Sequence, residues 1–481
     1  MSFTLPIWAS AQPSDGQSLP VFGAQHFTLS NGMDVILIEN QRAPVVTHMV
    51  WYNVGAADEA EGQSGLAHFL EHLMFKGTNN LEPGEFSQTI RRLGGNDNAF
   101  TSQDYTAYFQ TLSNQHLETV MQMEADRMTG LKLSHEESES ERSVILEERR
   151  QTLESSPQRL FFQSLKETLF EGHPYAIPII GTTDDIKGLS HEQIIRFYRQ
   201  HYRPDQARLI VSGAVDLETL RNLAEQTYGV IETPDTPLAE GSTMATPKQP
   251  EDINNALTSK STIIRHAPSI RQPLYMRIAA APNWTQDPQA SLALNILEEL
   301  IAGGQDAPLY QTLVAEQKVA SSVSLSYNGL SEGPAMITLS AYPSQDTSRE
   351  ELETAITAFL SKMQTYQWSA EDIAHAVTKL QDSAVYLRDS VTGPAMIIGR
   401  ATAAGMTLDE IESWPSLLER VTAEDVSLVS QKWLPIAQSL DGWLLPEAAQ
   451  ATQNGKDAEK NNDDNNTNNV DTSSPEEEDT P

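Results

Sequence analysis

Residues 65–78 read GLAHFLEHLMFKGT, and this stretch decides the predicted fold and chemistry. An α-helix turns by about 100° per residue, so His68 and His72 project from one face with Glu71 beside them. The opposite face is apolar and consists of Leu66, Phe69, Leu70, Leu73 and Met74. The stretch therefore predicts a helix that packs against a core with one side and presents chemistry with the other.

Two residues mark the expected ends of this helix, with Ser64 as its N-cap and Gly77 as its C-terminal stop. A single histidine in such a helix is most often a hydrogen-bonded core residue. The pattern H-x-x-E-H favours a metal site instead, because it places two imidazoles and a carboxylate within one turn. The chain has no cysteine, so any metal must take histidine and carboxylate ligands.

Length and charge restrict the remaining possibilities. A chain of 481 residues predicts two or more domains, and its formal net charge of −34 argues against binding to nucleic acid. No apolar run is long enough to span a membrane. Residues 1–20 resemble the end of a secretory signal, which predicts an exported, periplasmic protein. The polar, acidic tail at 449–481 is expected to be disordered, with a docking arm for a basic partner as the alternative.

The order of predicted elements is mixed and indicates an α+β fold, with sheets packed by helices. An Asn-Gly turn within residues 27–40 separates two predicted strands. Further strands are expected within 45–54, 98–112 and 207–215. Helices are expected at 65–77, 85–93, 115–131, from 134 onward and at 194–202.

The second half of the chain repeats the pattern of the first. The strand-like PLYMRIAAAPNW leads into LNILEELIAGG, which aligns with the H-x-x-E-H helix. The aligned residues are Asn295, Glu298 and Glu299 opposite His68, Glu71 and His72. We interpret this as a duplication that gives two similar domains, 21–232 and 262–448, joined by a linker at 233–261. The alternative is that two amphipathic helices look alike because both are amphipathic.

A catalytic zinc site needs a third protein ligand and an open position for water. In the predicted helix that contains SERSVILEERR, Glu141 and Glu148 are two turns apart and share a face, whereas Glu147 points elsewhere. Spacing alone does not choose among these residues. Glutamates on a surface helix are often only solvated.

Four segments together resemble the M16 metallopeptidases, the inverted-zincin family of mitochondrial processing peptidase and its single-chain bacterial relatives. The segments are HFLEHLMFKGT, LGGNDNAFTSQDYTAY, ERSVILEERR and HPYAIPIIGTTDDIKGLSHEQIIRFYRQHYRPDQARLIVSGAVD. The resemblance covers about residues 21–445. It implies two homologous mixed α/β domains of the M16/LuxS-like metallohydrolase fold, which form half of a clamshell that closes around unfolded peptide.

The resemblance also implies the members of the site. One zinc ion per chain would be bound by His68, His72 and Glu148, which lies 76 residues after His72 (148 − 72 = 76). Glu71 would be the general base that takes a proton from water and passes it to the departing amine. Glu141 would support the site from outside the set of ligands.

Substrate binding is expected at the strand after the metal helix. Asn98, Ala99, Phe100 and Thr101 resemble the family's edge strand, to which an extended peptide adds through main-chain hydrogen bonds. Such backbone recognition predicts little sequence preference. The alternative is an ordinary internal strand.

The pattern departs from the family in the second domain. Active members present an Arg and a Tyr seven residues apart, and here Val314 and Ser321 occupy these positions, with Tyr310 and Tyr327 nearby. Losing a donor to an oxyanion costs about 10²-fold or more in rate. We therefore expect a zinc-bearing subunit of a heterodimer whose partner supplies the Arg and Tyr, with a homodimer as the other assembly. The competing hypothesis is a non-catalytic or weakly active M16-like scaffold subunit.

Overall fold

The computed structural model describes residues 20–234, 249–257, 262–434 and 438–447. The acidic tail expected at 449–481 lies outside the described residues. So does the signal-like segment expected at 1–20, except for its last residue. Within the described part, no helix has the length and apolar character needed to cross a membrane.

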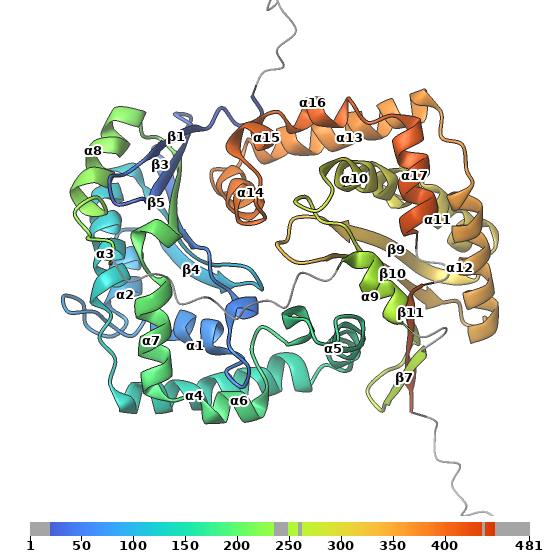
Figure 1. Ribbon diagram of the computed structural model, residues 1–481, viewed down its shortest axis with the longest axis horizontal. Helices are drawn as coiled ribbons and strands as arrows, with labels where there is room; N and C mark the ends of the chain where they lie inside the picture. The colour runs from blue at the N-terminus through green and yellow to red at the C-terminus, as the bar shows by residue number, and fades with distance from the viewer. Residues whose placement is uncertain (1–19, 235–248, 258–261, 435–437, 448–481) are drawn as a thin grey trace, which may run out of the picture. The chain divides into compact units, whose positions relative to one another are not determined.

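The first half of the chain builds a six-stranded sheet in the order β1-β2-β6-β3-β5-β4. Strands β1, β3, β4 and β5 of this sheet are labelled in Figure 1. Neighbouring strands are antiparallel except β2 and β6, which are parallel. The strands are β1 (Gln25–Thr28), β2 (Asp34–Glu39), β3 (Val45–Tyr52), β4 (Asn96–Thr101), β5 (Thr106–Ser113) and β6 (Ala207–Gly213). β3 is buried on both faces, as its continuous apolar sequence predicts, and β4 forms one edge.

Helices cover one face of this sheet and form a core with it. They are α1 (Leu66–Leu73), α2 (Glu85–Arg92), α3 (Leu117–Gly130), α4 (His135–Arg149), α6 (Thr183–Gly188), α7 (His191–His201) and α8 (Leu217–Thr227). The remaining helix of this half is α5 (Pro157–Leu169). α5 belongs to a separate core with strands of the second sheet. The helices and strands expected in this half are all present, so its α+β class is confirmed.

The second half builds a five-stranded sheet in the order β7-β11-β8-β10-β9. Its strands are β7 (Thr262–Ala267), β8 (Leu274–Ala281), β9 (Ala320–Asn328), β10 (Ala335–Pro343) and β11 (Leu440–Pro446). Here too one pair is parallel, β7 with β11, and the other neighbours are antiparallel. The order of these five strands, and the relative directions of neighbouring strands, are the same as those of β2-β6-β3-β5-β4 in the first sheet. Chance likeness of two amphipathic helices does not produce this match, which supports a duplication.

The helices of the second half are α9 (Pro250–Ala256), α10 (Pro288–Ala302), α11 (Pro308–Tyr310), α12 (Arg349–Gln364), α13 (Ala370–Leu387), α14 (Thr392–Ala403), α15 (Leu408–Glu412), α16 (Trp414–Leu418) and α17 (Ala423–Trp433). The segment expected to be a linker contains α9. The Asn254 side chain donates to the carbonyl of Ala280 and accepts from its N–H, each at 2.8 Å. α9 is therefore tied to β8, while the domain boundaries themselves stay a prediction.

The two halves share buried surface. Gly399 of α14 lies so close to Trp51 of β3 that a Cβ at this position would overlap the indole ring. The beginning of the first half also contacts the second, because the Glu412 carboxylate accepts the N–H groups of Phe22, Gly23 and Ala24 at 2.8, 3.2 and 2.7 Å. Apolar residues of both halves consequently belong to one core.

Candidate metal centre

The α1 helix presents its residues as the sequence predicts. Its apolar side is fully buried and consists of Leu66, Ala67, Phe69, Leu70 and Leu73. His68, Glu71 and His72 are half-buried on the other side. The rings of His68 and His72 lie 4.7 Å apart between centroids, as expected for side chains on successive turns.

The start of α1 differs from the expectation. Gly65 is the N-cap, with a φ of 88° that disfavours other residues, and Ser64 makes no capping hydrogen bond. The buried Glu59 carboxylate accepts the N–H groups of Gly65 and Ala67, both at 2.8 Å, and so satisfies the helix terminus. Ser64 instead donates to Asp185. The Ser64 cap was therefore a wrong prediction, because a distant carboxylate outcompetes a neighbouring hydroxyl.

The end of α1 also comes earlier than expected. The helix ends at Leu73 with Met74 as its C-cap, so Gly77 is not its terminator. Gly77 lies beyond the intervening turn. That turn places Lys76, whose ammonium group pairs with the Glu141 carboxylate.

The predicted third ligand reaches α1 from α4. Ser134 caps α4 in a reciprocal arrangement with Glu137, and α4 packs against α1. Glu148 is the penultimate residue of α4, and a π-helical turn follows at Arg150–Glu154. Arg149 donates to the carbonyl of Gly181 at 2.8 Å. The end of α4 is thereby anchored directly beside Glu148.

Three potential ligand atoms converge. The Oε2 atom of Glu148 lies 3.3 Å from Nε2 of His72 and 3.8 Å from Nε2 of His68. Ligands at 2.0–2.1 Å around tetrahedral zinc are separated by about 3.3 Å, so these spacings fit the edges of such a site. Glu148 Oε2 is buried and has no hydrogen bond of normal geometry with a described residue. Of the described side chains, these three form a group that could hold a metal ion.

Glu141 orients one of the rings. Its Oε1 atom accepts from Nδ1 of His72 at 2.9 Å, which leaves Nε2 of that ring to face Glu148. A carboxylate in this position fixes the tautomer of a metal-binding histidine and raises its basicity. Burial lowers the pKa of His72, but Glu141 and Glu148 together outweigh it and raise the pKa to about 9. In the metal-free site, a proton therefore competes with a metal ion for the His72 ring.

The neighbouring ring behaves differently. Burial, and next the charge of His72, lower the pKa of His68 to about 4. A neutral imidazole is the form that binds metal, so His68 is available over the physiological pH range. Its Nδ1 atom is buried with no hydrogen-bond partner in the described chain.

The Glu71 carboxylate makes no hydrogen bond to His68 or His72 among the contacts of the described residues. Its Oε2 atom accepts from the hydroxyl of Thr101 at 2.5 Å. Burial raises the pKa of Glu71, while the Thr101 hydroxyl lowers it. Glu71 and His72 also line one hollow with Phe75 and Lys76.

The predicted substrate strand is β4, and it forms an edge of the first sheet. The alternative of an internal strand is therefore excluded, whereas peptide binding stays a prediction. Phe100 packs its ring on Trp51 at 5.3 Å, and Thr101 turns toward Glu71. Asn98 is exposed, and its side chain accepts the N–H of Ala99 at 2.9 Å.

The positions that lack the family's Arg and Tyr lie around β9. Val314 is in a π-helical segment at Gln311–Glu316 and packs against the core. Ser321 is exposed on β9 and accepts from Gln272 at 2.8 Å. Tyr327 is buried, and its hydroxyl donates to the carbonyl of Pro282 at 2.6 Å. Tyr327 is thus committed to the interior of its own domain.

Sequence reasoning missed three contacts of this centre. Glu59 belongs to a run of acids, DEAEG, in which nothing singles it out. Lys76 and Thr101 were parts of quoted motifs, but their contacts with Glu141 and Glu71 join segments far apart in the chain. The position of Lys76 four residues after His72 is the one sequence signal that could have indicated its role.

Known proteins show the same organisation. The family model for insulinase (peptidase family M16) matches residues 34–183, and the model for the peptidase M16 inactive domain matches residues 188–380. Zinc protease PqqE of Helicobacter pylori is 30% identical over 337 residues, which are 70% of this chain and 73% of the relative. Cytochrome b-c1 complex subunit 1 of Rattus norvegicus is 31% identical over 215 residues, which are 45% of this chain and 44% of that protein.

A solved structure extends the match over nearly the whole described chain. The crystal structure of a protease from Helicobacter pylori aligns with a TM-score of 0.79 and 26% identity, covering 89% of this chain and all of the other (100%). Two sheets packed by helices, with a His-His-Glu cluster in the first domain, are features of a metallopeptidase. With the two family matches and the 30% identical relative, they show that the chain belongs to peptidase family M16.

Proposed function

We propose that this protein is a zinc-dependent endopeptidase that hydrolyses unfolded peptides. The observation that carries the proposal is the convergence of two imidazole nitrogens and one carboxylate oxygen at 3.3 and 3.8 Å, with the carboxylate oxygen buried and without a hydrogen bond. In the metal-free site the charge of this carboxylate is balanced by a protonated His72 ring, whose Nε2 atom lies 3.3 Å away. A divalent cation would supply the same charge balance, and histidine with carboxylate suits zinc.

Each residue of the proposed site has a separate role. His68, His72 and Glu148 would hold one zinc ion per chain, and the chemistry it supplies when bound is activation of water and polarisation of the scissile carbonyl. Glu71 takes the proton of the attacking water and delivers it to the departing amine, with its carboxylate oriented by Thr101. Glu141 holds the His72 ring in the tautomer that leaves Nε2 free.

Substrate would bind as an additional strand. The free edge of β4 leads to Thr101, which contacts Glu71, so a peptide paired with this edge passes beside the base. Asn98, Ala99, Phe100 and Thr101 supply the backbone of this edge.

A second M16-like subunit would complete the site. Val314 and Ser321 offer no cationic or phenolic donor, so we infer that a heterodimer partner contributes the Arg and Tyr, or that a homodimer works slowly without them. The secretory-like sequence at 1–20 supports an exported, periplasmic location. Cell fractionation would contradict this location if the protein stayed with the cytoplasmic fraction.

The test uses the full chain, alone and with the candidate partner. We expect about one zinc ion per chain by elemental analysis, and cleavage of a quenched unfolded peptide that a chelator abolishes and zinc restores. The pair should be faster than the chain alone. A protein without zinc at this site, or cleavage that survives complete chelation, would overturn the proposal.

A scaffold subunit is the second candidate. Its support is the absence of the Arg and Tyr, together with the similarity of the first half to a cytochrome b-c1 complex subunit. An inert pair that holds stoichiometric zinc would favour the scaffold over the peptidase.

A further inference from the structure

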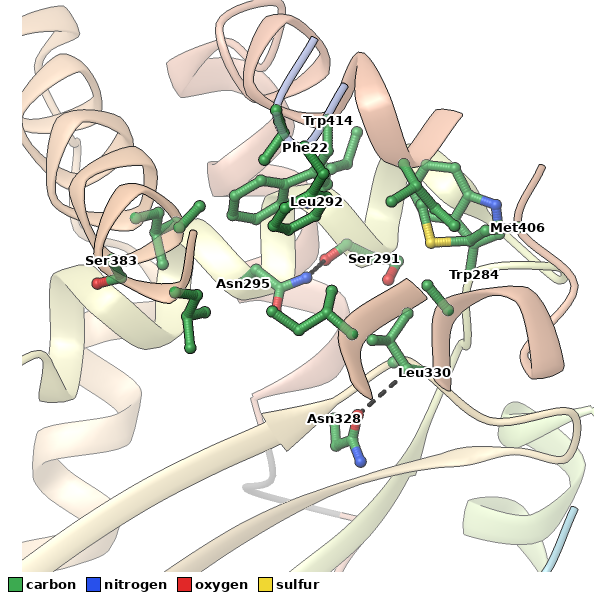
Figure 2. A pocket seen from close by; sticks show the side chains of 18 residues that line it. Phe22, Trp284, Ser291, Leu292, Asn295, Asn328, Leu330, Ser383, Met406 and Trp414 are labelled. Carbon is green, nitrogen blue, oxygen red and sulfur yellow. Dashed lines mark hydrogen bonds between the residues drawn. The ribbon is translucent and has the colours of Figure 1, made fainter. Parts of the chain in front are cut away.

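A cavity of about 270 Å³ lies mainly in the second domain, and Val21 and Phe22 from the start of the first half line part of it (Figure 2). Its position corresponds to that of the metal centre in the first domain. α10 packs against α13 as α1 packs against α4, and β9 is an edge strand like β4. Asn295 on α10 aligns with His68. Ser383 follows the helix-starting Ser369 by fourteen residues, as Glu148 follows Ser134 (383 − 369 = 148 − 134 = 14). Asn295 and Ser383 both line the cavity.

The lining of this cavity is uncharged and mostly apolar. It is formed by Val21, Phe22, Trp284, Ser291, Leu292, Asn295, Asn328, Gly329, Leu330, Leu380, Ser383, Ala384, Leu387, Ile397, Ala401, Met406, Ile411 and Trp414. None of these residues is a strong metal ligand, so this part of the second domain offers an apolar wall where the first domain has its candidate metal ligands. Burying a charge without a partner is costly, so the apolar wall favours an uncharged occupant.

One polar group in the wall is unused. The amide nitrogen of Asn295 donates to the carbonyl of Ser291 at 2.8 Å, which fixes the side chain. Its oxygen accepts no hydrogen bond from any described residue. Asn295 lines the cavity together with Phe22, Leu292 and Trp414, all of which are labelled in Figure 2. A ligand that donates one hydrogen bond from an apolar body complements this arrangement.

The size of the cavity selects the ligand class. Apolar cavities of about 150 Å³ bind benzene, so a volume of about 270 Å³ accommodates a fused two-ring compound. Phe22, Trp284 and Trp414 provide aromatic surfaces for it. We propose that the second domain has a binding site for a small uncharged aromatic compound of the indole type, whose N–H donates to Asn295. This site is separate from the zinc centre and independent of its activity.

The experiment uses the full chain and 5-fluoroindole followed by ¹⁹F NMR. We expect saturable binding to one site, unchanged by a chelator. Ala384→Phe fills the cavity and should weaken binding at least tenfold. Ala374→Phe, on an exposed part of the same helix and away from the cavity lining, should bind like the wild type. Wild-type protein without saturable binding, or a filled variant that binds equally well, would overturn the site.

The polar contact has its own test. Unlabelled indole should compete several-fold better than indene, which has the same shape without the N–H group. Asn295→Leu should remove this preference while still binding indene, and a preference that survives would refute the role of Asn295. Should Ala384→Phe fail to fold, a crystal soaked with 5-bromoindole decides by anomalous density. Density between Trp284 and Trp414 supports the site, and its absence there contradicts it.

Discussion

Glu141 accepts a hydrogen bond from Nδ1 of His72 at 2.9 Å and holds that ring from the side opposite to Glu148. The same carboxylate pairs with Lys76, so its own orientation is fixed. The His72 hydrogen bond lowers the pKa of Glu141. Glu141 therefore stays ionised, and able to accept a hydrogen bond from His72, at lower pH than an ordinary glutamate.

Glu141→Gln should weaken zinc binding by about 10- to 100-fold, the usual effect of removing such a carboxylate. Competition with a chromophoric chelator measures the affinity. Glu147→Gln is a matched control on the same helix, because Glu147 is exposed and pairs with Arg150. Equal zinc affinities of the two variants would refute the orienting role of Glu141.

Glu71→Gln should keep zinc and lose turnover by about 10²- to 10⁴-fold, because Gln accepts no proton while it keeps the shape of the side chain. Elemental analysis and peptide cleavage by the same preparation give both quantities. His72→Gln provides the comparison, since it should lose zinc as well as cleavage. Normal cleavage by Glu71→Gln would identify another residue as the base.

Glu59 should make stability depend on pH. Burial raises its pKa to about 8 against the opposing N–H groups of Ala67 and Gly65, whereas the unfolded value is near 4.5. The folded chain then binds the proton more tightly, so this group's contribution to the free energy of unfolding falls as pH rises from about 4.5 to 8. The slope of that contribution is at most about 1.4 kcal/mol per pH unit.

Glu59→Gln isolates this contribution because an amide does not titrate. Denaturant unfolding of both proteins, metal-free, should show the wild type losing stability relative to the variant between pH 5 and 8. The difference is informative even if the variant is less stable at every pH, since the lost hydrogen bond gives a constant offset. A difference that does not change with pH would contradict the raised pKa.

Restoring the missing pair tests the assembly. The double variant V314R/S321Y should raise cleavage by the chain alone, by about 10²-fold if it recovers one oxyanion donor. V314K/S321F is the control. Lys keeps the positive charge of Arg without its planar set of donors, and Phe keeps the ring of Tyr without its hydroxyl. A chain whose activity already equals that of the heterodimer, or a double variant with no gain, would speak against a donated Arg and Tyr.

The helices and strands whose positions depend on local periodicity could be predicted from the sequence. The polar face of α1 follows from its spacing, and the strands followed from apolar runs. The resemblance to the family pointed to Glu148, which spacing alone left equivalent to Glu141. Both carboxylates lie beside His72, in different places around its ring.

The sequence could not predict contacts that only the tertiary structure creates. Glu59 replaces Ser64 as the acceptor at the start of α1, and the helix α9 formed inside an expected linker. The packing of Gly399 on Trp51 joins residues from opposite halves of the chain. Nothing in either local sequence distinguishes these residues from their neighbours.

The carboxylate of Glu412 has a practical consequence for anyone who shortens this protein. A version that begins at Gln25 would retain β1 and all proposed zinc ligands. It would nevertheless lose the three N–H groups that bind Glu412, together with the Phe22 ring that closes one side of the cavity in the second domain. Expression designs and affinity tags should therefore leave residues 20–24 intact.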